Sequence, residues 1–541
     1  MFIKPIETIP EKLRPKMIYD LPELQFPDQI NITWDVLERN LESKRDNVAI
    51  FFEDRAITYG ELAEQVNRFS HVLKSRGIGR GDTVMLRMSD CPEGIICGLA
   101  IHKIGAVLMP TVALYKEKVV THLANTGLVK MMIVGKELFA DVDKGRGDYK
   151  TVETIMIVGE DPGPEFRDKG CLIYSEEMAR AEENKEVVFV GKDELAIKVF
   201  TGGTTGIPKG IMHTAAEVMS TGRVDNCVFP WDFGPGDVVA GPPPLGFFYG
   251  YMVKCIIPFR PGAATALMAG RATPESAFEI IQRRKVTVWH SAPTLYKMML
   301  DYPGWKKFDL GSVKYFTSGS AALLPQIQKE WKERYGKRIL NWMGGNELLG
   351  GFVATWRSPF KQGSLGYALP GYNLTVLDDG GNPCPLGETG RFAVQGPTGP
   401  VMIDDLDAQE KAVVNGWSLS GDAAYMDEDG CFWHASRTDD IIKTRGYRVS
   451  PEEVENTLNE HPAVKESAVI GVPDDVKGEA VKAFVVLRDK GKAGNAMAEE
   501  LKAFGRQTLA AFAGPHHVRF IDEIPKTELL KIKRTALREI K

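Results

Sequence analysis

Residues 195–214 read LAIKVFTGGTTGIPKGIMHT, and this stretch decides the fold and points to a site. The apolar run 195–200 predicts a buried strand, and IMH (211–213) predicts that a second strand follows the loop. Between them, four glycines let backbone N–H groups approach an anion, three threonine hydroxyls add donors, and one lysine adds a mobile positive charge. We predict a phosphate cradle rather than a Gly/Thr-rich surface turn. It is not the usual P-loop, because Lys209 follows a proline and no helix opens behind it.

Further apolar runs of four to eight residues alternate with helical patterns along the chain. This alternation is typical of buried parallel strands joined by crossover helices, so we expect an α/β fold with parallel-rich sheets. The segment 57–78 predicts one helix, with Leu62, Val66, Phe69 and Leu73 on the face that packs on a sheet. The expected strands are 82–88, 105–110, 130–135, 154–159, 195–200, 286–290 and 313–319.

The sequence pattern changes after about residue 370, where short alternating segments are separated by Asp-Gly and Gly-Gly turns. These segments predict antiparallel hairpins. Beyond Arg437 the pattern is helix, strand, strand and helix, which is typical of a small α+β unit of about one hundred residues. We therefore expect two domains, 1–438 and 439–541.

The 541 residues include 67 Lys and Arg and 72 Asp and Glu, a net charge of −5, and 43% are hydrophobic. This composition is that of an ordinary globular protein without the basic field that binds nucleic acid. Seven scattered cysteines predict reduced, buried thiols. The longest apolar stretch, 94–101, is too short to span a bilayer, and the first residues lack the apolar core of a signal peptide. We expect a cytoplasmic enzyme without a nucleic-acid or membrane partner.

The loop at 200–210 resembles the phosphate-binding loop of the adenylate-forming superfamily, which comprises acyl-CoA synthetases, adenylation domains and luciferases. Other motifs of that superfamily follow in its order along almost the whole chain, which makes coincidence negligible. They are TYGEL (58–62), NWMGGNE (341–347), GSLG (363–366) with Pro370-Gly371, SGD (420–422), RTDDIIKTRGYR (437–448) and PKTELLKIKR (525–534). The resemblance implies a large N-terminal domain with a small β-barrel-like part, a small mobile C-terminal α+β lid, and the use of ATP, Mg²⁺ and CoA.

The resemblance also implies a nucleotide site. Asp422 would accept hydrogen bonds from both ribose hydroxyls, although a Gly-Asp pair more commonly caps a turn, and Arg437 would approach the same ribose. Glu347 would bind the magnesium carried by ATP, because a hard carboxylate oxygen suits that ion. Asn346 replaces the usual threonine and Met343 the usual aromatic residue, so the details of phosphate and adenine binding differ. The residues expected at ATP or AMP are Thr201, Gly202, Gly203, Thr204, Thr205, Gly206, Lys209, Ser320, Ala321, Met343, Gly344, Asn346, Asp422, Arg437, Lys443 and Arg448.

Lys531 matches the catalytic lysine of the superfamily, although its basic surroundings also fit a solvated cationic helix. It would contact the substrate carboxylate and the α-phosphate and stabilise charge as the carboxylate attacks phosphorus, with Leu530 in place of the usual glycine. Asp439 matches the hinge about which the small domain rotates, so that the lid first excludes water from the acyl-AMP and then admits a thiol. Arg445 and Gly446 would line this CoA path.

The segment PPPLGFFYG (242–250) lies where the superfamily presents an aromatic wall to the acyl pocket. With PFRPGAA (258–264) and SAPT (291–294), it looks closest to ligases for benzoate and 2-aminobenzoate. Its bulky rings and Trp342 should shorten the pocket and disfavour long fatty acids, although aromatic runs are about as often core. His290 is interpreted as a satisfied core histidine. The expected substrate-pocket residues are Phe247, Phe248, Tyr249, Trp342 and Gly345.

The resemblance therefore predicts an acid–thiol ligase: a carboxylate and ATP give acyl-AMP and pyrophosphate, and CoA sulfur then displaces AMP. The expected acid is aromatic or alicyclic, such as benzoate, 2-aminobenzoate or cyclohexanecarboxylate, the last because Met343 and Gly345 leave room for a saturated ring. The alternatives are a stand-alone adenylation enzyme that loads an acyl carrier protein, a short- or medium-chain acyl-CoA synthetase, and a catalytically silent nucleotide-binding scaffold. A monomer and a homodimer are both compatible with the sequence.

Overall fold

The computed structural model describes residues 2–160, 162–201, 208–227, 234–321, 323–444, 447–474, 478–509, 513–526 and 532–540, with the backbone alone at 225–227, 439, 443 and 447–448. The chain forms two compact units. The first comprises Met1–Phe360, Ala368–Asn373 and Val394–Ser418, and the second comprises Lys361–Tyr367, Leu374–Ala393 and Leu419–Lys541. The sequence boundary at residue 438 stays a prediction.

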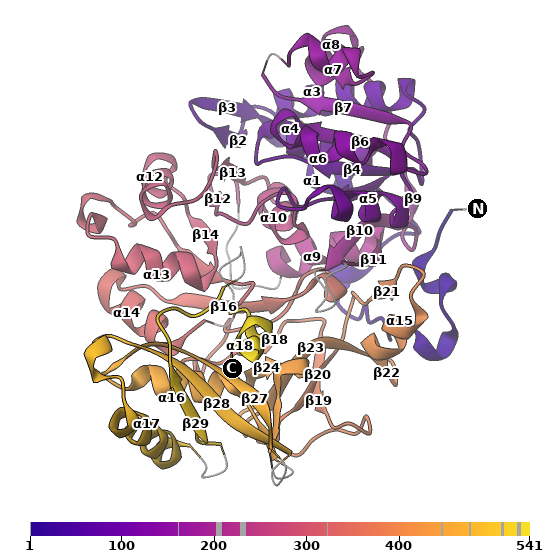
Figure 1. Cartoon of the computed structure of the whole chain (residues 1–541). Helices are drawn as coiled ribbons and strands as arrows, with labels where there is room; N and C mark the ends of the chain where they lie inside the picture. Colours follow the sequence, from indigo (N-terminus) through magenta and orange to yellow (C-terminus); the bar gives the residue numbers. More distant parts are fainter. Residues whose placement is uncertain are drawn as a thin grey trace. The chain divides into compact units, whose positions relative to one another are not determined.

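An eight-stranded sheet in the first unit contains β10 and β11, the strands that come before and after the Gly/Thr-rich loop in the sequence (Figure 1). In spatial order its strands are β21 (Val401–Met402), β11 (Lys209–Thr214), β10 (Leu195–Thr201), β5 (Val107–Pro110), β4 (Thr83–Arg87), β6 (Val129–Gly135), β7 (Thr154–Val158) and β8 (Leu172–Ile173). The strands from β10 to β8 are parallel, whereas β11 returns antiparallel along β10. All five residues of β4 are buried, so both faces of the sheet are covered, as parallel sheets require.

A nine-stranded sheet forms the other large layer of this unit. In spatial order its strands are β18 (Tyr367–Ala368), β17 (Gly351–Ala354), β16 (Ile339–Gly344), β15 (Tyr315–Ser318), β14 (Val288–Ser291), β12 (Val238–Ala240), β13 (Ala264–Leu267), β2 (Val48–Phe52) and β3 (Arg55–Thr58). The strands from β16 to β2 are parallel, and β17 and β3 add antiparallel partners at the two sides. Trp289, Phe316 and Trp331 are central in its core.

Helices pack on both sheets of the first unit. α5 (Glu117–Thr126) and α6 (Phe139–Lys144) share a core with β4 and β6, while α12 (Pro274–Arg284), α13 (Pro293–Asp301) and α14 (Pro325–Tyr335) share one with β14 and β15. α10 (Phe248–Tyr251), the π-helical segment η7 (Met252–Ile256) and α11 (Ile257–Phe259) follow one another, and η7 contacts β12 and β13. The other described helices are α1 (Ile32–Val36), α2 (Leu41–Lys44), α3 (Tyr59–Ser75), α4 (Pro92–Lys103), α7 (Pro164–Asp168), α8 (Tyr174–Arg180), α9 (Ala215–Cys227) and α15 (Leu406–Ala412).

The helix α3 shows how local sequence and packing agree. Thr58 and Glu61 form a reciprocal capping box that satisfies the first N–H groups of the helix. The four residues predicted to share its inner face, Leu62, Val66, Phe69 and Leu73, are all fully buried. The prediction for this helix is therefore confirmed.

The second unit contains most of a curled half-barrel sheet followed by an α+β region (Figure 1). The half-barrel strands are β19 (Asn373–Leu377), β20 (Gly390–Gln395), β23 (Trp417–Met426), β22 (Val413–Val414) and β24 (Phe432–Arg437). The C-terminal sheet consists of β26 (Tyr447–Val449), β25 (Ile442–Thr444), β28 (Gly478–Leu487), β27 (Val464–Asp474) and β29 (His517–Phe520). α16 (Pro451–Glu460) and α17 (Asn495–Thr508) share one core with this sheet, and α18 (Arg534–Glu539) shares another.

These elements confirm the expected α/β fold class. All seven predicted strands are present, and β23 and β24 form the antiparallel hairpin expected around the Asp-Gly turn. Among the described residues, no helix combines the length and the apolar character needed to cross a membrane.

Candidate active site

The predicted residues of the first unit follow the ends of strands. Thr201 ends β10, Ser320 follows β15, and Glu347 follows β16. The carboxyl ends of parallel strands are where α/β sheets usually bind ligands. Ser320 and Ala321 are both exposed, and Ser320 has a φ of +69°, a conformation that costs energy for a residue with a side chain. Such strain is frequent at binding sites.

The Gly/Thr-rich loop is held at its base by an antiparallel pair of strands, in which Thr201 lies opposite Lys209. Lys209 is half-exposed, and its Nζ lies 3.5 Å from Asp405 Oδ2. Because an exposed ion pair of this kind is worth little, the ammonium can exchange this partner for a phosphate. The loop residues that lie outside the described part of the chain include Gly202, Gly203, Thr204, Thr205 and Gly206. The phosphate cradle therefore stays a prediction.

A short turn, η9 (Asn346–Leu348), presents Glu347 beyond the end of β16. Asn346 Nδ2 donates to Phe200 O at 3.1 Å, at the entry to the Gly/Thr-rich loop. His213 Nε2 lies 2.8 Å from Asn346 O. Asn346, where the superfamily usually has threonine, therefore ties the turn to the strand that carries the predicted phosphate loop.

His213 and Glu217 are two residues that the sequence analysis missed. His213 Nδ1 lies 2.9 Å from Glu217 Oε1, and both side chains are buried. Glu217 also accepts from Gly399 N at 3.0 Å and from Thr214 N at 2.8 Å. The ring of His213 thus lies within hydrogen-bond distance of two oxygens, one of the Glu217 side chain and one of the Asn346 backbone, and it joins these two groups. The available signal was the His-to-Glu spacing of four residues at the start of α9.

Glu347 is half-buried, and its carboxylate folds back over Gly345: a Cβ there would stand 3.0 Å from Oε2. Met343 is half-buried and Gly344 is exposed at the end of β16. Among the described residues, no group of three or more His, Cys, Asp or Glu side chains could hold a metal by itself. A single carboxylate nevertheless fits Mg²⁺, which usually takes one or two protein carboxylates and completes its shell with nucleotide phosphates and water.

The predicted ribose residues are neighbours in the second unit. Asp422 on β23 pairs with Arg437 on β24, and Arg437 Nη1 lies 3.2 Å from each carboxylate oxygen. The guanidinium packs over Gly421, where a Cβ would stand 2.8 Å from Nη2. Asp422 is buried and Arg437 is largely exposed. The structure thus brings the two residues together, as expected for groups that share one ligand.

His434 is a third residue that the sequence analysis missed. Its Nε2 lies 3.2 Å from Asp422 Oδ1 and its Nδ1 lies 2.8 Å from Glu452 Oε2 on α16. Burial opposes the charged ring, but the carboxylates of Glu452 and Asp422 outweigh burial and raise the pKa of His434 to about 10. The DEDG turn predicts that β24 pairs with the strand of Asp422, whereas only the tertiary structure shows that the His434 ring also contacts α16.

The remaining lid residues are described in part. Asp439 lies in the short turn η10 (Thr438–Asp440), and Lys443 on β25 pairs with Arg448 on β26. Their side chains, together with residues Arg445, Gly446 and Lys531, lie outside the described part of the chain. Their roles as hinge, nucleotide contacts, CoA path and catalytic lysine stay predictions.

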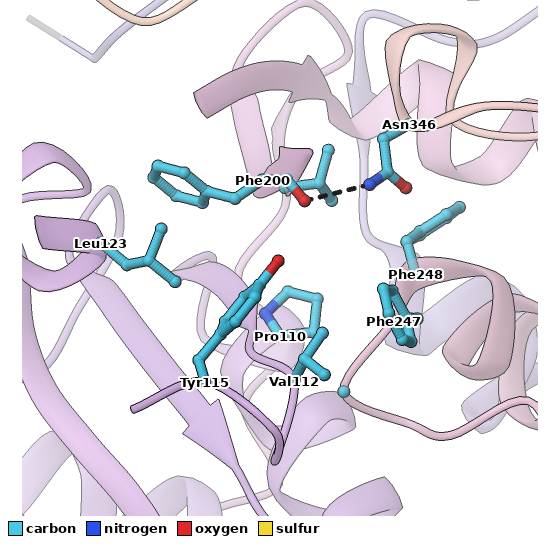
Figure 2. A pocket seen from close by; sticks show the side chains of 10 residues that line it. Pro110, Val112, Tyr115, Leu123, Phe200, Phe247, Phe248 and Asn346 are labelled. Carbon is cyan, nitrogen blue, oxygen red and sulfur yellow. Dashed lines mark hydrogen bonds between the residues drawn. The ribbon is translucent and has the colours of Figure 1, made fainter. Parts of the chain in front are cut away.

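A pocket lies beside the base of the loop in the first unit, and Figure 2 shows Phe247 and Phe248 on one side of it. The hydrogen bond from Asn346 to Phe200 lies at its edge. The other labelled lining residues are Pro110, Val112, Tyr115 and Leu123. The pocket is therefore largely apolar and adjoins the turn that presents Glu347.

The other two predicted ring residues form a separate cluster with His290. Tyr249 and Trp342 meet edge to face at 5.7 Å, and the His290 ring lies 6.3 Å from Tyr249 and 5.9 Å from Trp342. Thr317 Oγ1 lies 2.7 Å from His290 Nδ1, and the histidine is fully buried, as expected for a core residue. Burial, with a smaller effect of Lys254, lowers the pKa of His290 to about 3, so this cluster is neutral.

The comparisons with known proteins agree with this arrangement. Residues 37–402 match the family model described as AMP-binding enzyme, and residues 453–531 match that of the AMP-binding enzyme C-terminal domain. The chain is 31% identical to acetyl-coenzyme A synthetase of Bacillus subtilis (strain 168), over 94% of this chain and 90% of that protein. It is 30% identical to benzoate–CoA ligase of Thauera aromatica, over 96% of this chain and 97% of that protein. The crystal structure of an anthranilate CoA ligase with anthranoyl-AMP superposes with a TM-score of 0.87 at 28% identity, covering 96% of this chain and 98% of that one.

The chain therefore belongs to the AMP-binding enzyme family. It is an enzyme of the AMP-forming acyl-CoA synthetase type, a ligase that uses ATP, Mg²⁺ and CoA with a carboxylate. The expected family and enzyme class are confirmed.

Proposed function

We propose that this ligase activates an aromatic or alicyclic carboxylate of the benzoate, 2-aminobenzoate or cyclohexanecarboxylate type. The observation that carries the proposal is the ring cluster of Tyr249, His290 and Trp342, of which Trp342 lies on β16, the strand that leads to Glu347. Rings packed edge to face form a rigid, apolar surface, and aromatic contacts of this kind suit another ring. The similarity to a benzoate–CoA ligase and to an anthranilate CoA ligase supports the same class of acid.

The wall of this cluster is held firmly, which favours a short, broad acyl group over a long chain. Trp342 is buried, and its indole occupies the space that a side chain at position 351 would need: a Cβ on Gly351 would stand 1.3 Å from Nε1. The indole is therefore pressed against the backbone of β17. Turning it aside to lengthen the pocket would break this packing.

The charge of the cluster favours a monocarboxylate. A pKa of about 3 keeps His290 neutral at physiological pH. The nearby ammonium of Lys254 is fully buried and already paired with Asp90. A second carboxylate on an acyl group beside this cluster would therefore compete with Asp90 for Lys254, and its desolvation would be poorly compensated.

The proposed mechanism has two displacements. A carboxylate oxygen attacks the α-phosphorus of ATP and the bond to pyrophosphate breaks; the CoA sulfur then attacks the acyl carbon and the bond to AMP breaks, with the thiol proton lost to solvent. Lys209 and Lys531 would stabilise the developing phosphate charge, and Asp422 would hold the ribose. Mg²⁺ held by Glu347 would neutralise charge on the leaving pyrophosphate.

The lid roles belong to the same proposal. Residues 439–541 would rotate about Asp439 between the two displacements, so that Lys531 serves the first and the backbone at Gly446 admits the thiol in the second. A residue without a side chain suits a path that a pantetheine arm must enter. A cytoplasmic location also stays a prediction.

A panel of acids tests the proposal. AMP release is measured with benzoate, 2-aminobenzoate, cyclohexanecarboxylate, hexanoate and acetate, with free CoA present. We expect the ring acids to have the highest kcat/KM, and we expect Trp342→Ala, but not the matched Trp342→Phe, to gain activity with octanoate. Higher kcat/KM with acetate or hexanoate would instead identify a short- or medium-chain synthetase. Turnover only after addition of an acyl carrier protein would identify a carrier-loading enzyme.

A further inference from the structure

One imidazole ring joins two carboxylates that come from different parts of the second unit. His434 on β24 contacts Asp422 of the half-barrel through Nε2 at 3.2 Å and Glu452 of helix α16 through Nδ1 at 2.8 Å. Only 13% of the His434 side chain is exposed, against 10% for Asp422 and 24% for Glu452. The three groups therefore interact largely out of water, where charge-assisted hydrogen bonds are strong.

The charges of this group explain why the ring must carry a proton on each nitrogen. Asp422 also faces the guanidinium of Arg437, with Nη1 at 3.2 Å from both oxygens. The carboxylates at the two ends of the ring raise the pKa of His434 to about 10 despite its burial. A neutral ring could donate to only one of them and would leave the other carboxylate facing a lone pair.

This contact connects residues on the two sides of the predicted hinge. His434 precedes the predicted hinge residue Asp439, and Glu452 follows it. A second hydrogen bond crosses the same segment, from Ser450 Oγ to Ala435 O. Contacts between β24 and the beginning of α16 thus fasten the first helix after the hinge to the strand before it, and rotation about the hinge has to break them.

We propose that His434 is a positioning residue that holds the carboxylate of Asp422 in its ligand-binding orientation and couples that orientation to the docking of α16 through Glu452. This inference rests on the proposed role of Asp422 at the ribose of ATP. With Glu452 in place, the imidazolium fixes one oxygen of Asp422, and Arg437 steadies both. When α16 leaves, Nδ1 loses its partner and the carboxylate is held less firmly. Nucleotide affinity then depends on a helix residue that does not touch the nucleotide.

The test compares Glu452→Gln with Glu460→Gln, a matched change at an exposed position near the other end of α16. The KM values for ATP, carboxylate and CoA are measured separately, and the ¹⁵N shifts of the His434 ring are recorded at pH 7.5. We expect Glu452→Gln to raise the KM for ATP about fivefold or more, the usual lower range for coupled sites, with the KM for the carboxylate unchanged. The wild-type ring should show two protonated nitrogens, and the Glu452→Gln ring should not.

Two further variants separate this inference from the function on which it rests. His434→Phe should raise the KM for ATP, and adding Glu452→Gln to it should have no further effect, because the coupling runs through the ring. An unchanged KM for ATP in Glu452→Gln, together with a raised one in Asp422→Asn, would overturn the coupling alone. An unchanged KM for ATP in Asp422→Asn would overturn the ribose role itself. Thermal unfolding of each variant confirms that it is folded.

Discussion

The buried pair of His213 and Glu217 makes a quantitative prediction for His213→Leu. The change strands the carboxylate of Glu217, whose side chain is only 3% exposed, and removes the donor to Asn346 O. Leaving a buried polar group without its partner costs about 1–3 kcal/mol. We expect a loss of this size in the free energy of unfolding of the first unit. The KM for ATP should also rise, because the turn that presents Glu347 loses one of its two anchors.

A double-mutant cycle with urea unfolding measures the reason for this loss. Glu217→Gln replaces the carboxyl group by an amide that keeps an oxygen for the backbone donors, so the double variant should recover about 1 kcal/mol relative to His213→Leu. His71→Leu, at a half-buried histidine of α3, is the matched control for a lost imidazole. If the two changes at positions 213 and 217 were simply additive, the ring would act through packing alone and the hydrogen-bond reasoning would be refuted.

The other predictions concern the two half-reactions, the acyl wall and the lid contact. Lys531→Ala should abolish acyl-AMP formation, measured by pyrophosphate exchange, but should still permit CoA transfer from supplied acyl-AMP. Equal loss of the two half-reactions would contradict the assigned role. Gly446→Trp should block thioester formation and spare acyl-AMP synthesis, and normal CoA turnover would remove Gly446 from the thiol path. Gly351→Ala should displace the Trp342 indole that packs on this glycine. The kcat/KM for ring acids should then fall by a larger factor than the KM for ATP changes. The raised pKa of His434 contributes stability that is fully present below about pH 6.5 and is lost as the pH rises through about 10. The free energy of unfolding should therefore fall across this pH range. The fall should be less steep in Glu452→Gln.

Much of the fold could be predicted from the sequence because the local sequence pattern agrees with the packing. The apolar runs became buried parallel strands, and the capping box of Thr58 with its one-sided apolar face became α3. The Gly/Thr-rich loop could be assigned between a strand and its antiparallel return because the residues on both sides have strand periodicity. The family could be named from motifs that keep their order along the chain.

Contacts between side chains that lie far apart in the sequence could not be predicted. His213 meets the carbonyl of Asn346, 133 positions away. Tyr249 meets Trp342 in a ring cluster, whereas Phe247 and Phe248 line the pocket. Periodicity tells which face of a strand is buried, but not which buried side chain it will face.

The sequence by itself determined the order of the predicted strands and the family, and it predicts the anion-binding chemistry of the Gly/Thr-rich loop. Only the tertiary structure decided that the carboxylates of Asp422 and Glu452 share the imidazolium of His434. The same holds for the packing of the Trp342 indole against Gly351. The physical reason is that hydrogen bonds and ring contacts act over a few ångströms in space, whereas sequence patterns report only on neighbours along the chain.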